Sequence, residues 1–159
     1  PISGLIYRKE VEAWGPAEHI GTFRGNQVSI AAARGAFDFI EAYNLEEHTK
    51  DIGAYLVKGL ESLETEIPFI GEIRGRGMMI GVEFVKDKST KEPFPEFVKK
   101  FRAECFQRGL LFEVGGHYNN VLRLVPPLVT TYSIVDAAIK IMKEAIVVCA
   151  EEYLESALA

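Results

Sequence analysis

Arg123 is the residue whose type and neighbours point most directly to chemistry. It lies in NVLRLV, residues 120–125, where the alternation of side chains predicts a strand. Leu122 and Leu124 then share one face, and Val121, Arg123 and Val125 share the other. A guanidinium is permanently charged, and its planar fork suits a carboxylate. Two explanations are open: an edge strand whose arginine meets an acidic residue or water, and a pocket wall that binds a carboxylate.

The segments on either side of this strand favour the explanation in which the strand forms the wall of a pocket. Gly115-Gly116 precedes the strand and Pro126-Pro127 follows it. Glycines allow another backbone to approach closely, and prolines end the strand. The flanks therefore strengthen the pocket explanation without deciding between the two.

A second group that could bind an anion is the segment GTFRGN, residues 21–26, directly before a predicted helix. Backbone N–H groups and the hydroxyl of Thr22 at such a place suit a phosphate oxygen. The segment lacks the GK[ST] of a P-loop and is not a Rossmann fingerprint. A simple helix cap is the alternative explanation.

The segment RGRG, residues 74–77, carries two arginines among glycines. It could bind anions, but a tight hairpin with outward-facing arginines is the favoured interpretation. Glu83 and Glu113 stand on predicted strands and could pair with arginines. The sequence shows no nucleophile next to a base, and the three histidines (His19, His48 and His117) do not have the spacing of metal ligands.

The bulk composition limits the classes of protein. The chain has 159 residues, 48% hydrophobic and 26% charged, with a net charge of -5, which fits a globular protein with one sizeable core. No Lys/Arg run exceeds a dipeptide, which argues against nucleic acid as a partner. No apolar run approaches the roughly 18 residues of a membrane span. Cys105 and Cys149 fall on apolar helix faces, which suits reduced core thiols and a cytoplasmic location.

The elements that must position these residues follow from periodicity. We expect strands at 2–8, within 71–85, at 110–114 and at 120–125, with loops at 13–25 and 86–93. We expect helices at 27–43 (capped by Asn26), 46–66, 94–108 and 134–155 (capped by Ser133 in a Ser-x-x-Asp signature). This order predicts an α/β or α+β layer, in which helices cover one face of a small sheet.

The polar stretch 44–51 is the best candidate for a domain boundary. A strand, a loop and a helix precede it, and a self-contained α-β-β-α-β-β-α unit follows it. The chain opens at Pro1 directly in an apolar segment, whereas native termini usually begin with polar residues. We therefore expect that the chain starts inside a domain and that part of its function lies upstream.

Taken together, these motifs resemble the C-terminal part of a class III aminotransferase, a pyridoxal-phosphate enzyme of fold type I. The resemblance runs along essentially the whole chain and rests on four segments in the family's order. These segments are PISGLIYRKEV, HIGTFRGNQVSIAAARGAF, GEIRGRGMMIGVEFV and RGLLFEVGGHYNNVLRLVPPLVTT. The GTFRGNQ form and the Glu113-x-Gly-Gly turn are most similar to 2,4-diaminobutyrate:2-oxoglutarate aminotransferases.

The resemblance implies roles for particular residues. Thr22 matches the threonine that reaches across a homodimer to the phosphate of pyridoxal 5'-phosphate (PLP), and Gly21 and Phe23 shape its loop. Arg123 matches the arginine that binds the α-carboxylate of the amino acid or of 2-oxoglutarate, so the carboxylate explanation is the one we adopt. The family's Schiff-base lysine lies upstream, so no catalytic residue is assigned in this chain and the chain alone is expected to be inactive.

The resemblance also implies a division of the chain and leaves rival functions. Residues 1–45 would end the PLP-binding large domain, and residues 46–159 would form the C-terminal small domain. The alternatives are a 4-aminobutyrate or ornithine aminotransferase, another class III enzyme such as a mutase or racemase, and a non-enzymatic α/β module that binds carboxylates.

Overall fold

The computed structural model describes residues 2–65 and 67–158. The chain divides into two compact units, Pro1–Asn44 and Leu45–Ala159, and each is described by itself. The division falls within the polar stretch at which the sequence changes character.

The first unit contains one long helix. A 3-10 helix, η1, spans Lys9–Val11, and helix α1 spans Gln27–Ala42. The Ser29 N–H donates to the side-chain oxygen of Asn26 at 3.0 Å, which confirms the predicted cap. None of the described residues of α1 is buried.

The prediction of a strand at residues 2–8 is wrong. Those residues form no strand, and they are exposed. A strand needs a neighbour to which its N–H and C=O groups can hydrogen-bond, and the described part of this unit supplies none. An alternating pattern of apolar side chains predicts a strand, but it does not show whether a second strand is present to pair with it.

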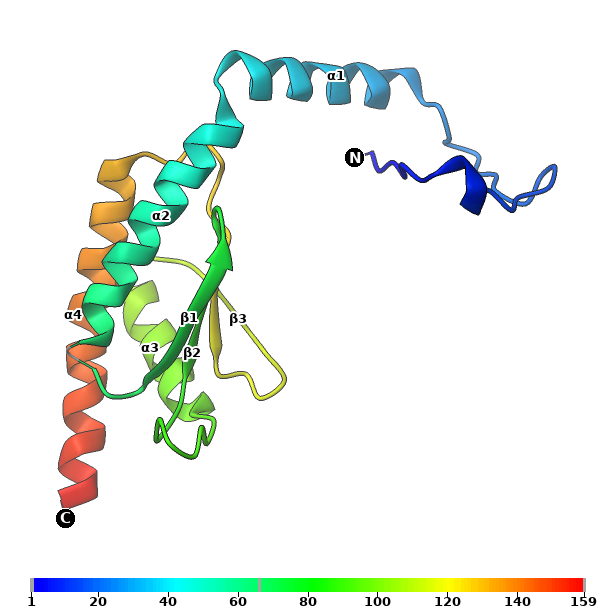
Figure 1. Ribbon diagram of the computed structural model, residues 1–159. Helices are drawn as coiled ribbons and strands as arrows, with labels where there is room; N and C mark the ends of the chain where they lie inside the picture. The colour runs from blue at the N-terminus through cyan, green and yellow to red at the C-terminus, as the bar shows by residue number, and fades with distance from the viewer. Residues whose placement is uncertain (1, 66, 159) are drawn as a thin grey trace. The chain divides into compact units, whose positions relative to one another are not determined.

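The second unit places three helices on one face of a four-stranded sheet (Figure 1). The helices are α2 (Leu45–Glu64), α3 (Pro95–Gln107) and α4 (Tyr132–Leu158). The strands are β1 (Ile70–Arg76), β2 (Met79–Phe84), β3 (Glu113–Gly115) and β4 (Val121–Leu124). The predicted fold class and the order of elements in this unit are confirmed.

The sheet is antiparallel, with the strand order β1-β2-β4-β3. Strand β4 pairs with β2 on one side and with β3 on the other, so it lies inside the sheet. The edge position in the first explanation of Arg123 is therefore wrong, whereas its side chain does reach solvent, as that explanation expected. Pairing of β4 with both neighbours could not be inferred from the alternation within its own sequence.

The core lies between the sheet and the helices. Helix α2 contributes a buried stripe at the i, i+4 and i+3 spacing, Ile52, Leu56, Leu60 and Leu63. Strand β2 contributes alternate residues, and α3 contributes an aromatic cluster. The buried residues of these two elements and their flanks are Met78, Ile80, Val82, Phe84, Phe94, Phe97, Val98, Phe101 and Cys105.

Two boundaries differ from the sequence prediction. Strand β3 begins only at Glu113, because Leu110 and Phe112 pack against the core without joining the ladder. Helix α4 begins at Tyr132, so Ser133 lies inside the helix and is not its cap. Asp136 accepts a hydrogen bond from the Tyr55 hydroxyl at 2.7 Å, which takes the place of the predicted capping box.

Candidate functional site

Arg123 lies on the sheet face that is turned away from the three helices. Its neighbours Leu122 and Leu124 are buried on the helix side, which confirms the predicted alternation along β4. The Arg123 side chain is exposed. Within the described part of the chain it makes no ion pair and no side-chain hydrogen bond. A permanently charged group with no internal partner is available for an external anion.

A hollow of about 340 Å³ opens beside Arg123. It lies where the ends of β3 and β4 meet the loop before α4 and the first turns of that helix. Its polar contributions come from Arg123, Glu113 and Thr130, and the rest is mainly apolar, including Leu111, Phe112, Val125, Pro126, Pro127 and Ile134. An apolar hollow with a few polar groups is the usual form of a small-molecule site.

The loop that forms one wall of this hollow is fixed by hydrogen bonds. The Thr130 hydroxyl donates to the Pro127 carbonyl at 2.7 Å, and the Thr130 N–H donates to the same carbonyl at 2.9 Å. Nε2 of His48, on α2, donates to the Thr130 carbonyl at 2.9 Å. The wall is therefore held to α2. Periodicity does not predict this contact, because 82 residues separate His48 from Thr130.

Glu113 is the residue directly opposite Arg123 in the β3–β4 ladder. Directly opposed residues of an antiparallel pair point to the same face, with Cβ atoms about 4.5–5.5 Å apart. Both side chains are exposed, and both line the hollow. The sequence indicated that Glu113 could pair with an arginine. The register places it opposite Arg123, but the two form no ion pair within the described residues.

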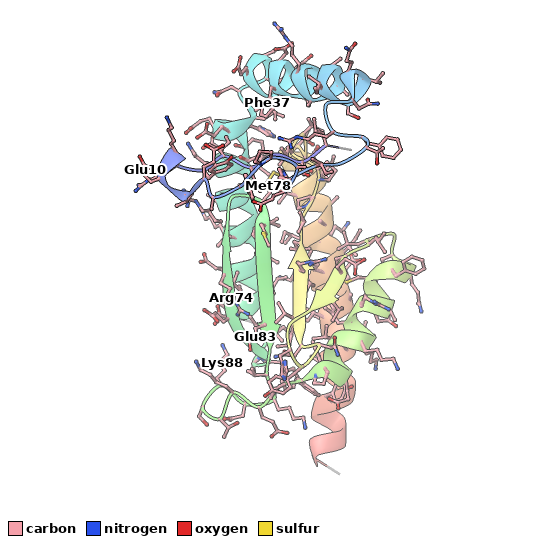
Figure 2. All side chains as sticks on the ribbon, turned by 90° about the vertical axis from the view of Figure 1, so that its right-hand side faces the viewer. Glu10, Phe37, Arg74, Met78, Glu83 and Lys88 are labelled. Atoms are coloured by element: carbon pink, nitrogen blue, oxygen red, sulfur yellow. The ribbon has the colours of Figure 1, made fainter. Side chains whose placement is uncertain are left out.

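Arg74, on the same sheet, differs from Arg123 because two glutamates neutralise its charge. Its guanidinium donates to Glu83 at 2.6 Å and to Glu72 at 2.8 Å, and Figure 2 shows Arg74 and Glu83 near each other on β1 and β2. The hydrogen bond to Glu83 is the main cause that raises the pKa of Arg74. The predicted hairpin with outward arginines is confirmed, and Arg74 is committed to structural pairs.

Asn120 holds the start of β4 against the end of β2. It is 2% exposed, and its side-chain amide donates to the Phe84 carbonyl at 3.0 Å, while its own carbonyl accepts from the Phe84 N–H at 2.8 Å. The amide also donates to Glu83 at 3.4 Å. These bonds fix the register that places Arg123 opposite Gly81.

The candidate phosphate loop, residues 21–26, forms tight turns in the first unit. The Arg24 N–H donates to the Gly21 carbonyl at 3.0 Å, the Asn26 N–H donates to the Phe23 carbonyl at 3.2 Å, and Gly25 has a φ of 74°. The turns expose Thr22 and leave Phe23 87% exposed. Gly21 and Phe23 line a hollow of about 1020 Å³ within this unit.

This loop fits an accessory contact to a phosphate group. The Thr22 hydroxyl forms no hydrogen bond within the described residues, so it can donate to a phosphate oxygen. The loop alone does not make a complete phosphate site, because Asn26 already satisfies the Ser29 N–H and the Arg24 guanidinium bonds the His19 carbonyl. Thr22 and Arg123 belong to different units.

Among residues 2–65 and 67–158, no group of three or more His, Cys, Asp and Glu residues could hold a metal ion. No described helix combines the length and the apolar character needed to cross a membrane.

Residues 1–146 match the family model described as "Aminotransferase class-III". A "Diaminobutyrate--2-oxoglutarate aminotransferase" of Rhizobium meliloti is 37% identical over 142 residues, which are 86% of this chain and 30% of that protein. An "Alanine/serine racemase" of Pyrococcus horikoshii is 34% identical over 145 residues, 91% of this chain and 30% of that protein.

A solved structure shows the same fold. It is an amine transaminase from an uncultivated Pseudomonas species in a PLP-bound form, with a TM-score of 0.78 and 28% identity over 84% of this chain and 30% of that one. The chain thus spans about a third of the length of the relatives it matches. Because the family match covers nearly the whole chain, and the fold agrees with it, the chain belongs to the class III aminotransferases.

Proposed function

We propose that this chain is the C-terminal part of a PLP-dependent aminotransferase that moves an amino group from 2,4-diaminobutyrate, or a similar ω-amino acid, to 2-oxoglutarate. The donor carbon loses its amino group and becomes a carbonyl, and the keto carbon of 2-oxoglutarate gains the amino group and becomes that of glutamate. The observation that carries the proposal is Arg123, exposed and without an ion pair in the described part of the chain, beside an apolar hollow.

Arg123 has the chemistry that both substrates require. Each carries an α-carboxylate, and a guanidinium fork binds a carboxylate through two parallel hydrogen bonds. In 2-oxoglutarate the reacting carbon is bonded directly to that carboxylate, so holding the carboxylate fixes where the reacting carbon lies, which lowers the entropic part of the barrier. The R. meliloti relative supports 2,4-diaminobutyrate as the donor; 4-aminobutyrate and ornithine are the alternative donors.

The first unit would supply a contact to the cofactor. In this proposal, residues 1–45 end a PLP-binding large domain, residues 46–159 form a small domain, and Thr22 donates to the cofactor phosphate of the neighbouring subunit in a homodimer. Gly21 and Phe23 would shape that loop. PLP, when bound, supplies the electron sink for removing a proton next to the amine. The buried, unpaired Cys105 and Cys149 support a cytoplasmic location.

The experiment that tests the proposal is Arg123→Ala in the full-length protein. Loss of charge-assisted hydrogen bonds predicts a KM for 2-oxoglutarate raised on the order of 10- to 100-fold. Because Arg123 is exposed and has no internal ion pair in the described residues, the unfolding free energy should change by less than about 0.5 kcal/mol. Steady-state kinetics and urea unfolding measure the two effects.

Arg76→Ala is the matched control, because Arg76 is also an exposed arginine of this sheet and does not line the hollow. Its KM for 2-oxoglutarate should match that of the wild type. If Arg123→Ala instead unfolds more easily and keeps its KM, then Arg123 has a structural role and the proposal is wrong. The isolated chain should have no transaminase activity, since its relatives are about three times as long.

Racemisation is the second candidate, because the P. horikoshii relative is named for it. A racemase converts one enantiomer of an amino acid into the other without consuming a 2-oxo acid. Chiral chromatography of a single amino acid incubated with the full-length protein, with and without 2-oxoglutarate, separates the two activities.

A further inference from the structure

Thr130 joins one wall of the hollow beside Arg123 to helix α2, and the inference drawn from this contact rests on the proposed function of that arginine. The loop after β4 includes Val125, Pro126, Pro127 and Thr130, and all four residues line the hollow. Thr130 is 5% exposed. Its polar groups therefore have to find their hydrogen-bond partners within the protein.

The hydrogen bonds of Thr130 fix the shape of this loop. Its hydroxyl and its N–H both donate to the Pro127 carbonyl, at 2.7 Å and 2.9 Å, which closes a tight turn. Its own carbonyl accepts from Nε2 of His48 at 2.9 Å. Because these groups are already used, Thr130 shapes the hollow and we do not expect it to donate to a ligand.

The position of Thr130 also sets where α4 begins. Thr131 follows directly, and its carbonyl accepts from the Val135 N–H at 3.1 Å, an i to i+4 hydrogen bond that opens the helix. Ile134 and Val135, in the first turn, line the hollow as well. Thr130 therefore affects two sides of the hollow, the proline loop and the first turn of α4.

Helices α2 and α4 lie side by side (Figure 1), and α2 holds this junction at a second point. Tyr55 lies seven residues after His48, about two helical turns along the same face. Its hydroxyl donates to Asp136 at 2.7 Å, and its ring meets that of Tyr132 edge-on at 4.9 Å. Tyr55 is 40% exposed, so water competes for its hydrogen bond more than for the partly buried bond of His48. We therefore assign the larger effect to His48.

We propose that His48 is a positioning residue for the 2-oxoglutarate carboxylate, and that it acts by holding the Thr130 carbonyl. With this bond in place, the wall beside Arg123 is ordered before the substrate arrives, so binding does not include the cost of ordering it. Without the bond, the buried carbonyl loses a donor and the loop has to move to regain one. Substrate binding then has to restore the wall, and the affinity for the acceptor falls.

The experiment compares three substitutions in the full-length holoenzyme. His48→Ala removes the donor, His48→Leu removes it and keeps most of the bulk, and His48→Gln keeps an amide nitrogen as many bonds from Cα as Nε2 of histidine. We expect the KM for 2-oxoglutarate to rise about 3- to 10-fold in the alanine and leucine variants, and to stay within about twofold of the wild type in the glutamine variant.

Two further readouts separate binding from chemistry. The kcat at saturating 2-oxoglutarate should change by less than about twofold in all three variants, because the lost interaction serves the ground state and the transition state alike. The inhibition constant of glutarate, which has no keto group and does not react, should rise about as much as the KM for 2-oxoglutarate in the alanine and leucine variants.

A double-mutant cycle with Arg123→Ala separates positioning from a general structural role. If His48 acts through the carboxylate subsite, His48→Ala should change KM by less than about twofold once Arg123 is replaced, because the contact that it positions is already lost. A general loss of structure would have its full effect in both backgrounds. The matched control is His117→Ala, because His117 is an exposed histidine that contacts the Tyr118 ring and does not line the hollow. Its KM should equal that of the wild type.

Each result has a distinct meaning. The inference is overturned if His48→Ala and His48→Leu keep the wild-type KM, if His48→Gln raises KM as much as they do, or if the rise persists in the Arg123→Ala background. It is also overturned if neither the alanine nor the leucine variant folds, since His48 is then needed for the fold itself. The proposed function stands in all these cases, provided that Arg123→Ala alone raises KM. If the wild type transaminates no amino donor with 2-oxoglutarate, the proposed function is wrong and this inference falls with it.

Discussion

Two arginines of the same sheet have different roles at the residue scale. Arg74 is bound to Glu83 and Glu72, and the contacts extend to the buried Asn120 through Glu83. Arg123 faces the hollow with only Glu113 opposite it in the ladder. The residue type is the same, but Arg74 is held in ion pairs, whereas Arg123 makes no ion pair within the described residues, and we propose that it binds a ligand.

The two thiols give a prediction at the residue scale. Burial raises the pKa of Cys105 to about 12 and that of Cys149 to about 11, from an ordinary value of 9.0. In the unfolded chain both thiols lose their protons near the ordinary value, whereas the folded chain keeps them. The unfolded state therefore binds fewer protons above pH 9, and stability must fall as the pH rises toward the folded pKa values.

Urea unfolding between pH 8 and about 11 measures this effect, with a slope of up to about 1.4 kcal/mol per pH unit for each thiol. The variant Cys105→Ala with Cys149→Ala should show a shallower slope, whatever its absolute stability, since the other titrating groups remain. Equal slopes in the two proteins would contradict the prediction.

At the element scale, the backbone of α2 approaches the turn between β1 and β2 very closely. Gly53 of α2 lies against Gly77 in the turn between β1 and β2, and a Cβ at position 53 would overlap the Gly77 carbonyl. Gly77 itself has a φ of 55°, a left-handed conformation that favours glycine. The helix and the hairpin therefore meet without intervening side chains.

Gly53→Ala tests this contact. Alanine is the better helix former by about 1 kcal/mol, so a helix in open solvent would gain stability. Here we expect a net loss of about 1–3 kcal/mol in unfolding free energy, because the helix must move off the hairpin. Gly35→Ala in α1 is the control, since nothing lies within 4 Å of a Cβ there. A stabilised Gly53→Ala variant in urea unfolding would mean that the contact is loose.

The two units differ in burial at the scale of the whole molecule. The described residues of the first unit are exposed or half-buried, whereas the second unit has a continuous core that includes Ile52, Phe84, Phe97, Leu122 and Met142. A helix of 16 residues without a packed face is marginal in water. We therefore expect the first unit to need a partner surface for stability.

Amide hydrogen exchange of the isolated chain should show this difference. We expect amides of α1 to exchange within the fastest measurable class, and those of β2, β4 and the middle of α4 to exchange orders of magnitude more slowly. Addition of the rest of the full-length protein should protect α1. Equal protection of α1 and β2 in the isolated chain would contradict the expectation.

The sequence by itself determined the helices, the β1–β2 hairpin and the inward stripes. Apolar residues at helical spacing predicted α2 and α3, Asn26 predicted the start of α1, and alternation predicted that Arg123 faces away from Leu122 and Leu124. These features depend on residues within a few positions of one another, so their signal is local. The family motifs suggest a carboxylate ligand for Arg123, which stays a prediction.

Only the tertiary structure decided which segments become neighbours. It removed the strand expected at 2–8, put β4 inside the sheet, held Thr130 to His48 and set Glu113 opposite Arg123. The physical reason is that strand pairing satisfies backbone groups between segments far apart in the chain, and a shift of one residue would reverse every face. The sequence identified the arginine, and the register supplied its acidic neighbour.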